Sequence, residues 1–186
     1  LQEAVKDFGE IEMASGDFPK EWINECDNMV LSPGIPADSD YVIAFHNLGK
    51  YIIGEVELAF QCSRGKLIAI TGTNGKTTTT SLVGEILDNY FKSSFVVGNI
   101  GYAYTTKVPQ MKDESITVAE ISSFQMEWID TFHPDISCIL NLTEDHLDRH
   151  KTMENYINCK LNVNANQTEN EPIILNYDDI ETQKIL

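Results

Sequence analysis

A glycine-rich segment that follows a short apolar run carries the clearest chemical signal in the sequence. It has the sequence Gly72-Thr73-Asn74-Gly75-Lys76-Thr77, and Thr78 comes next. Glycines let the backbone wrap closely around an anion, and the positive end of a following helix faces the same place. Lys76 can then contact the β- and γ-phosphates of a nucleotide, and the Thr77 hydroxyl can bind Mg²⁺. We therefore predict a phosphate-binding loop, although Ile70 replaces the first glycine of the usual pattern; the alternative is an ordinary glycine turn.

A carboxylate follows a second apolar run. Glu120 comes directly after residues 116–119, and the carboxyl end of a central strand is where open α/β sheets bind ligands. Glu120 is therefore predicted to bind the magnesium ion of the nucleotide, since Mg²⁺ prefers oxygen ligands. The alternative is a surface glutamate at a strand end. Just beyond it, Ser122 and Gln125 fit an S-x-x-Q capping box, which is their predicted local role.

A third polar cluster, Leu142–His150, follows another apolar run. Its acids, histidines and arginine indicate a metal or phosphate site. His146 and His150 are four residues apart and could share a helical face, so a zinc pair is one alternative. The absence of a third ligand and of an H-E-x-x-H pattern argues against zinc. A solvated polar loop is the other alternative.

A lysine interrupts an apolar stripe near the end of the sequence. Thr152 can cap a helix, and the stripe of that helix consists of Met153, Tyr156, Ile157 and Leu161. Lys160 falls within the stripe. Burial lowers the pKa of a lysine and makes the neutral amine available for chemistry. The alternative is a buried stem whose ammonium group reaches the surface.

These sites require strands that end beside one another. The predicted strands cover residues 28–31, 51–53, 67–71, 95–97, 116–121, 136–142 and 173–175. The predicted helices cover 41–48, 55–61, 152–161 and the segment after the glycine-rich loop, whose apolar face consists of Leu82, Val83, Ile86, Leu87 and Tyr90. Alternation of this kind predicts an α/β fold with a mostly parallel sheet and flanking helices. Polar residues 62–66 suggest a domain boundary, which we place between 63 and 64. The missing first strand and the early end suggest an incomplete chain.

Composition narrows the possible functions. The chain has 13 Lys and Arg against 29 Asp and Glu, and its net charge of −16 argues against nucleic-acid binding. Its 42% hydrophobic content is typical of a soluble globular protein. The four widely spaced cysteines indicate reduced thiols, and no apolar run is long enough to span a membrane. We therefore expect a cytoplasmic protein without membrane insertion.

The order of the motifs resembles the Mur ligase family, whose members add amino acids to a UDP-linked cell-wall precursor. The matching segments are Gly72–Thr77, Gly98–Gly101, Glu120–Gln125 and Asn141–His150. Ser122–Gln125 and Ser32–Pro36 resemble the members that add D-glutamate. The resemblance, which runs from about Asn28 to the end, implies part of a Rossmann-like UDP-substrate-binding domain at 1–63. It further implies an incomplete central P-loop ATPase domain at 64–186, without the third domain of the family.

The resemblance also implies residue roles. Lys76 and Thr77, with the rest of the 72–78 loop, would bind the ATP phosphates and a first Mg²⁺, with Glu120 as a further ligand. Asn99 and His146 would contact the precursor or a second Mg²⁺, and Ser32 and Ser122 belong to the substrate side. Lys160 matches a carbamylated lysine that serves as a metal ligand. Lys76, Glu120, His146 and Lys160 would thus form the catalytic set.

The reaction implied by the resemblance is amide-bond formation through an acyl phosphate. ATP would phosphorylate the terminal carboxylate of UDP-N-acetylmuramoyl-L-alanine, and the amine of D-glutamate would displace phosphate. We expect a monomer, and little or no activity from this chain alone because the third domain is missing. The alternatives are a Mur ligase that adds another amino acid, a P-loop phosphotransferase or NTPase, and a non-enzymatic nucleotide-binding module.

Overall fold

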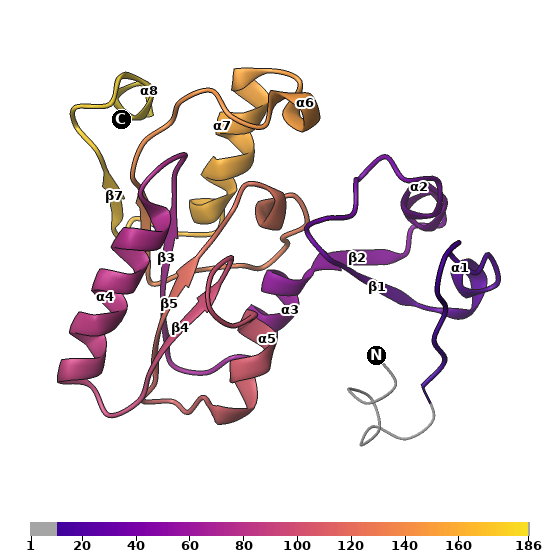
Figure 1. Ribbon diagram of the computed structural model, residues 1–186, viewed down its shortest axis with the longest axis horizontal. Helices are drawn as coiled ribbons and strands as arrows, with labels where there is room; N and C mark the ends of the chain where they lie inside the picture. The colour runs from indigo at the N-terminus through magenta and orange to yellow at the C-terminus, as the bar shows by residue number, and fades with distance from the viewer. Residues whose placement is uncertain (1–10, 186) are drawn as a thin grey trace.

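A computed structural model describes residues 11–185 and contains two sheets (Figure 1). The smaller sheet pairs β1 (Asn28–Leu31) with β2 (Tyr51–Gly54) in parallel. It is accompanied by α1 (Trp22–Glu25) and α2 (Asp40–Asn47). Figure 1 shows these elements as a lobe of their own, joined to the rest of the molecule through α3 (Glu55–Cys62). We call this the small lobe, residues 11–54, and the rest of the described chain, residues 55–185, the large lobe.

The larger sheet has five strands in the order β4-β5-β3-β6-β7, and every neighbouring pair is parallel. The strands are β3 (Lys66–Thr71), β4 (Ser94–Gly98), β5 (Ile116–Glu120), β6 (Ile136–Ile139) and β7 (Ile173–Leu175). The predicted mostly parallel α/β fold is therefore confirmed. Because all five strands run in one direction, the segments that follow β3, β4, β5 and β6 meet at one edge of the sheet.

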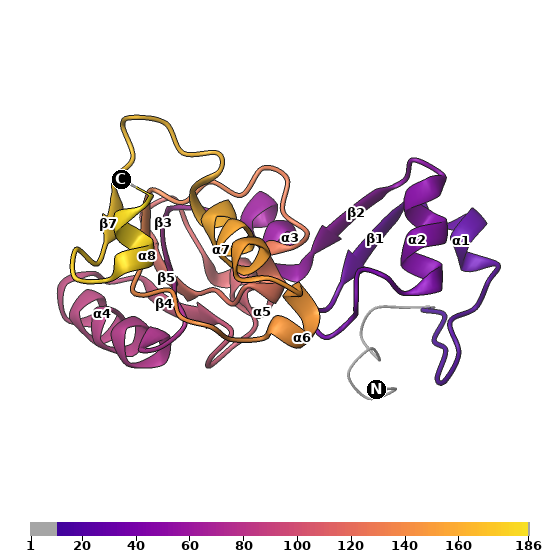
Figure 2. The same cartoon turned by 90° about the horizontal axis from the view of Figure 1, so that it is seen from above.

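Helices cover both faces of this sheet (Figure 2). α4 (Lys76–Tyr90) contacts β3, β4 and β5 on one face, above a core that includes Ile70, Leu87 and Val118. Against the other face lies a larger core, to which α3, α5 (Tyr104–Lys107) and α7 (Met153–Leu161) contribute. Cover on both faces explains the nearly continuous apolar strands.

The remaining helices are short. They are α6 (Leu147–His150), α8 (Ile180–Gln183) and the 3₁₀ turns Val108–Gln110, Phe124–Met126 and Asn162–Asn164. None of the helices over residues 11–185 is both long and apolar enough to cross a membrane. The four cysteines, all within the described residues, are free thiols.

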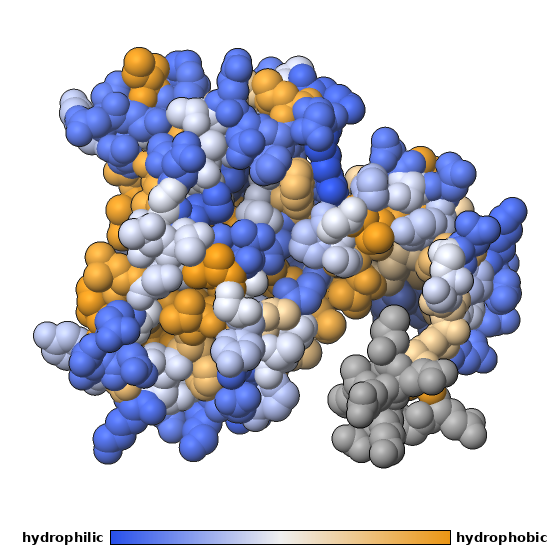
Figure 3. All heavy atoms as spheres, viewed as in Figure 1, coloured by the Kyte–Doolittle hydropathy of each residue, from blue (hydrophilic) through white to orange (hydrophobic). Residues whose placement is uncertain are grey.

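The face of α4 that packs against the sheet differs from the face that its apolar residues predict. Its buried residues are Thr80, Gly84 and Leu87. Its exposed large hydrophobic residues are Leu82, Ile86 and Tyr90. A Cβ atom on Gly84 would lie 2.2 Å from Cγ2 of Val96, so the helix approaches β4 through its small residues. The predicted apolar face is therefore largely wrong, and Figure 3 shows hydrophobic residues exposed over α4 and β4.

α3 is anchored to the loop that precedes β6 by a buried carboxylate. Glu57 is fully buried and accepts hydrogen bonds from the backbone N–H groups of Asp130 (3.0 Å), Thr131 (2.9 Å) and Phe132 (3.0 Å). Burial by itself raises the pKa of Glu57, but the hydrogen bonds from Asp130 and Thr131 outweigh it, and the pKa lies below its usual value. The carboxylate therefore stays ionised and fixes α3 between the two lobes.

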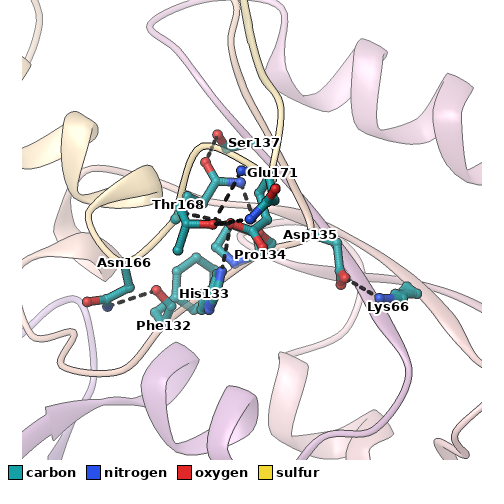
Figure 4. A network of polar contacts seen from close by, with 11 residues as sticks. Lys66, Phe132, His133, Pro134, Asp135, Ser137, Asn166, Thr168 and Glu171 are labelled. Carbon is teal, nitrogen blue, oxygen red and sulfur yellow. Dashed lines mark hydrogen bonds and ion pairs between the residues drawn. The ribbon is translucent and has the colours of Figure 1, made fainter.

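A second polar network lies where the strands of the large sheet begin, at the end opposite to their carboxyl ends (Figure 4). Lys66 at the start of β3 pairs with Asp135 just before β6 (2.6 Å), and Asn166 Nδ2 donates to the carbonyl oxygen of Phe132 (3.0 Å). The first bond ties the start of β3 to the segment before β6, and the second ties that segment to the one before β7. Because they lie at the amino ends of the strands, the carboxyl ends remain for the candidate site.

Candidate active site

The predicted phosphate-binding loop lies between the end of β3 and the start of α4. Gly72 (φ +145°) and Gly75 (φ +81°) have backbone conformations that side chains disfavour. A Cβ atom on Gly72 would also lie 3.1 Å from Cβ of Leu140. α4 begins at Lys76, so its first N–H groups, which have no acceptor within the helix, lie at the loop. The loop therefore has the geometry expected for anion binding.

Residues that follow β6 hold the loop in shape. Asn141 accepts from the backbone of Asn74 through Oδ1 (2.8 Å) and donates back to its carbonyl oxygen through Nδ2 (3.0 Å). The Thr73 hydroxyl donates to the Thr143 carbonyl oxygen (3.1 Å) and lies 3.0 Å from the Tyr156 hydroxyl. β6 ends at Ile139, earlier than predicted, because the residues beyond it leave the sheet to form these contacts. Contacts of Asn141, Thr143 and Tyr156 with the loop were not predicted from the sequence.

Two lysines meet the backbone of the loop. Lys76 Nζ donates to the carbonyl oxygen of Thr73, and Lys160 Nζ donates to that of Gly72, each at 2.9 Å. Lys160 is only 2% exposed, so the alternative with its ammonium group at the surface is wrong. Burial, followed by the charge of Lys76, lowers the pKa of Lys160 to about 8. A buried amine that is easily deprotonated thus lies directly against the phosphate-binding loop.

Glu120 is buried rather than a surface residue. It ends β5, pairs in register with Ile70 of β3, and is 1% exposed. Its Oε1 atom accepts from Nδ2 of Asn99 (2.8 Å), whereas Oε2 is buried without a hydrogen-bond partner. A buried carboxylate oxygen without a partner is unfavourable unless a cation or ligand completes its surroundings. Its place beside the phosphate-binding loop makes Oε2 a candidate cation ligand.

Gly98 allows β4 to end against Glu120. Its φ is +104°, and a Cβ atom there would lie 2.2 Å from the Glu120 carbonyl oxygen. We expect Gly98→Ala to displace Asn99 from Glu120 and to lower the free energy of unfolding by roughly 2–3 kcal/mol. Urea unfolding measures this change. Gly34→Ala is the matched control, because nothing lies within 4 Å of a Cβ there; equal stability loss in both variants would contradict the explanation.

The two histidines of the third cluster have different surroundings. His146 precedes α6 in a left-handed conformation (φ +52°), and its Nε2 atom lies 3.4 Å from Asp145. His150 is buried, with Nε2 2.9 Å from the Ser123 hydroxyl, and burial lowers its pKa. Over residues 11–185 no group of three or more His, Cys, Asp or Glu side chains is arranged to hold a metal. The zinc alternative therefore has no structural support.

A cavity between the lobes brings some of the predicted substrate residues together. It measures about 480 Å³ and is lined by Val30, Leu31, Ser32, Pro33, Glu55, Gly98, Asn99, Ala103 and Gln125. Ser32 from the small lobe and Asn99 from the large lobe thus share one cavity, and Asn99 joins that cavity to Glu120. Ser122 and His146 lie outside the lining. Ser122 instead forms the predicted capping box, donating from its N–H to Gln125 Oε1 (2.9 Å) and accepting from the Gln125 N–H (3.4 Å).

The sequence of this region identifies its family. Residues 70–186 match the sequence family described as the Mur ligase middle domain. The chain belongs to the Mur ligase family. The resemblance noted from the motifs is therefore confirmed.

Curated relatives share much more sequence than the motifs alone. Over 164 residues the chain is 57% identical to a UDP-N-acetylmuramoylalanine–D-glutamate ligase from Lachnoclostridium phytofermentans, covering 88% of this chain and 36% of the relative. Over 180 residues it is 49% identical to the protein of the same name from Clostridioides difficile, covering 96% and 40% respectively. The chain therefore spans well under half the length of these Mur ligase relatives.

The fold also matches solved structures. A MurF ligase from Thermotoga maritima in complex with ADP has a TM-score of 0.57 and 23% identity, and the alignment covers 87% of this chain and 46% of that one. MurF from Acinetobacter baumannii has a TM-score of 0.55 and 20% identity. At this level of identity the similarity supports the Mur ligase fold alone.

Proposed function

We propose that the chain forms the nucleotide-binding core of an ATP-dependent ligase that adds D-glutamate to UDP-N-acetylmuramoyl-L-alanine in peptidoglycan synthesis. The names of the curated relatives support this choice of reaction, and the ADP bound by a structural neighbour supports the nucleotide. The observation that carries the proposal is the place of Glu120. It lies beside the phosphate-binding loop and, through Asn99, adjoins the cavity between the lobes.

Two parts of the chain have separate roles in the proposed function. Residues 1–63 would contribute to the domain that binds the UDP-linked precursor. Ser32 from this part and Asn99 from the other would contact the precursor in the cavity that they share. Residues 64–186 would bind ATP through the 72–78 loop. We retain Ser122 and His146 as proposed substrate contacts, although they lie outside the cavity lining. We further propose that the ligase is a cytoplasmic monomer.

The side chains around the phosphate-binding loop include oxygen ligands suited to Mg²⁺. The unpartnered Oε2 of Glu120 and the exposed Thr77 hydroxyl are oxygen ligands of the kind Mg²⁺ prefers. We propose that these two residues hold one ion, and that His146 and Lys160 contribute to a second. Bound Mg²⁺ would neutralise charge on the phosphates. The ammonium group of Lys76, which donates a hydrogen bond to the Thr73 carbonyl oxygen, would turn to the β- and γ-phosphates.

Lys160 fits the proposed carbamylation. A neutral amine attacks CO₂, forming an N–C bond and releasing one proton, which leaves a carbamate with one negative charge. The pKa of about 8 makes the neutral form accessible near neutral pH. The product would place an anionic oxygen ligand beside Gly72, whose carbonyl oxygen Lys160 now contacts. Carbamylation would thus turn a cation into a metal ligand.

The proposed reaction passes through an acyl-phosphate intermediate. The terminal alanine carboxylate attacks the γ-phosphorus of ATP, and ADP leaves. The D-glutamate amine then attacks the acyl carbon, an amide bond forms, and phosphate departs with the loss of a proton from nitrogen. The contribution of this chain is to position the two anionic reactants and offset their charge, which is how proteins promote phosphoryl transfer.

Phosphate release by the full-length protein tests this function. The assay contains ATP, Mg²⁺, UDP-N-acetylmuramoyl-L-alanine and, in turn, each of a panel of amino acids. We expect release only when D-glutamate is present. Release that depends on another amino acid would indicate a different Mur ligase reaction. Release without any amino acid would instead favour a P-loop NTPase or phosphotransferase.

A further inference from the structure

Arg149, in the single-turn helix α6, joins three separate segments through one guanidinium group. Its Nε atom donates to Glu127 Oε1 (3.0 Å), and Nη2 donates to Oε2 of the same carboxylate. Nη1 donates to the Pro33 carbonyl oxygen, and Nη2 also donates to that of Ile35, each at 3.0 Å. The reaction described above uses none of these groups. Two of these four donor contacts reach the small lobe and the other two hold the guanidinium in place, which indicates a specific role.

The surroundings of Arg149 favour a fixed geometry. Its side chain is 21% exposed and that of Glu127 is 15% exposed, so solvent only partly screens the pair. The guanidinium carbon lies 4.5 Å from the centre of the Phe124 ring, which also contacts the His146 ring at 4.8 Å between centres. A planar guanidinium can bind a carboxylate with two bonds while it stacks on a ring, and a lysine cannot.

The two carbonyl oxygens that Arg149 binds belong to one turn. Within this turn, residues 32–36, the N–H of Ile35 donates to the Ser32 carbonyl oxygen at 2.9 Å. Ser32 and Pro33 line the 480 Å³ cavity together with Asn99. The turn belongs to the small lobe, whereas Asn99 and Arg149 belong to the large one. The position of Ser32 relative to Asn99 therefore depends on how Arg149 holds the turn.

We infer that Arg149 is a positioning residue for the precursor-binding cavity. Together with Glu127 it fixes turn 32–36 against the segment that carries His146, and so holds Ser32 and Asn99 in one cavity. Arg149 itself does not contact the precursor. This inference rests on the proposed function, because the ligand that the cavity positions is the UDP-linked precursor.

The experiment compares Arg149→Lys and Glu127→Gln with wild type in the full-length protein. Lys151→Gln is the matched control: with Arg149 and Glu127, Lys151 lines a second cavity of about 450 Å³, but its Nζ atom donates to the Asp148 carbonyl oxygen within its own segment. We expect Arg149→Lys to raise the KM for UDP-N-acetylmuramoyl-L-alanine by roughly tenfold or more, since lost positioning weakens the aligned complex. The KM for ATP should change by less than about twofold, because the loop contacts remain. The control should match wild type in both.

Hydrogen exchange supplies a readout that needs no substrate. We expect the amide of Ile35 to exchange faster in Arg149→Lys, while the loop at 72–77 exchanges as in wild type. Glu127→Gln keeps one acceptor and should give smaller changes in the same direction. An unchanged precursor KM, or an equal rise in the KM for ATP, would overturn the inference while leaving the proposed function intact. A wild-type protein that binds ATP but not the precursor would overturn both.

Discussion

Glu120→Gln is expected to reduce D-glutamate-dependent phosphate release by roughly a hundredfold to a thousandfold, the range seen when one well-placed electrostatic contact is lost. Glutamine keeps the shape of the side chain and can still accept the bond from Asn99. It replaces the unpartnered Oε2 atom with an amide NH₂ group, which donates hydrogen bonds and cannot bind a cation. The loss should therefore appear in the Mg²⁺ dependence of the reaction rather than in the fold.

Titration calorimetry with ATP separates this effect from misfolding. Wild type should bind ATP more tightly when Mg²⁺ is present, and Glu120→Gln should lose most of that dependence while still binding free ATP. Glu85→Gln is the matched control, because Glu85 is an exposed carboxylate on α4. If Glu120→Gln retained full Mg²⁺ dependence, the assignment of Glu120 as a magnesium ligand would be wrong.

The sequence predicts the strands and the phosphate-binding loop well because both depend on local patterns. Short apolar runs bounded by polar or glycine residues mark the strands, and Gly72–Thr77 follows one of them. The buried face of α4 was not predictable in this way. The apolar residues of α4 indicate one face, but Gly84 allows a closer approach to Val96 on another, and packing against the sheet determines which is buried.

Contacts between distant segments leave no periodic signal in the sequence. Asn74 and Asn141 are 67 residues apart and Pro33 and Arg149 are 116 apart, yet each pair is joined by hydrogen bonds. The apolar stripe of its own helix predicts that the stem of Lys160 is buried, but it leaves open whether the ammonium group reaches the surface. That its Nζ atom meets the Gly72 carbonyl oxygen depends instead on how α7 packs against the loop, which only the tertiary structure shows.

Lys160→Met is expected to stabilise the protein while sharply lowering ligase activity. The drop in pKa from 10.5 to about 8 corresponds to a cost of about 3 kcal/mol for the buried charged form. The variant also loses the hydrogen bond to Gly72, which lowers its stability by about 1 kcal/mol. In CO₂-free buffer near pH 7, urea unfolding should therefore show a variant more stable by roughly 2 kcal/mol. Activity should fall about a hundredfold or more, because the proposed metal ligand is lost.

The pH dependence of stability isolates the lysine from other effects. Between about pH 8 and pH 10.5 the folded protein has lost the Lys160 proton and the unfolded chain still holds it, so this group makes stability rise with pH in that window. Below about pH 8 both states are protonated and its contribution is constant. The stability advantage of Lys160→Met over wild type should therefore shrink as pH rises from about 8 to about 10.

A constant stability advantage would mean that Lys160 keeps its proton when buried, and that its amine is not available to CO₂. A stability cost for a residue that activity requires is what a functional role for this buried lysine predicts.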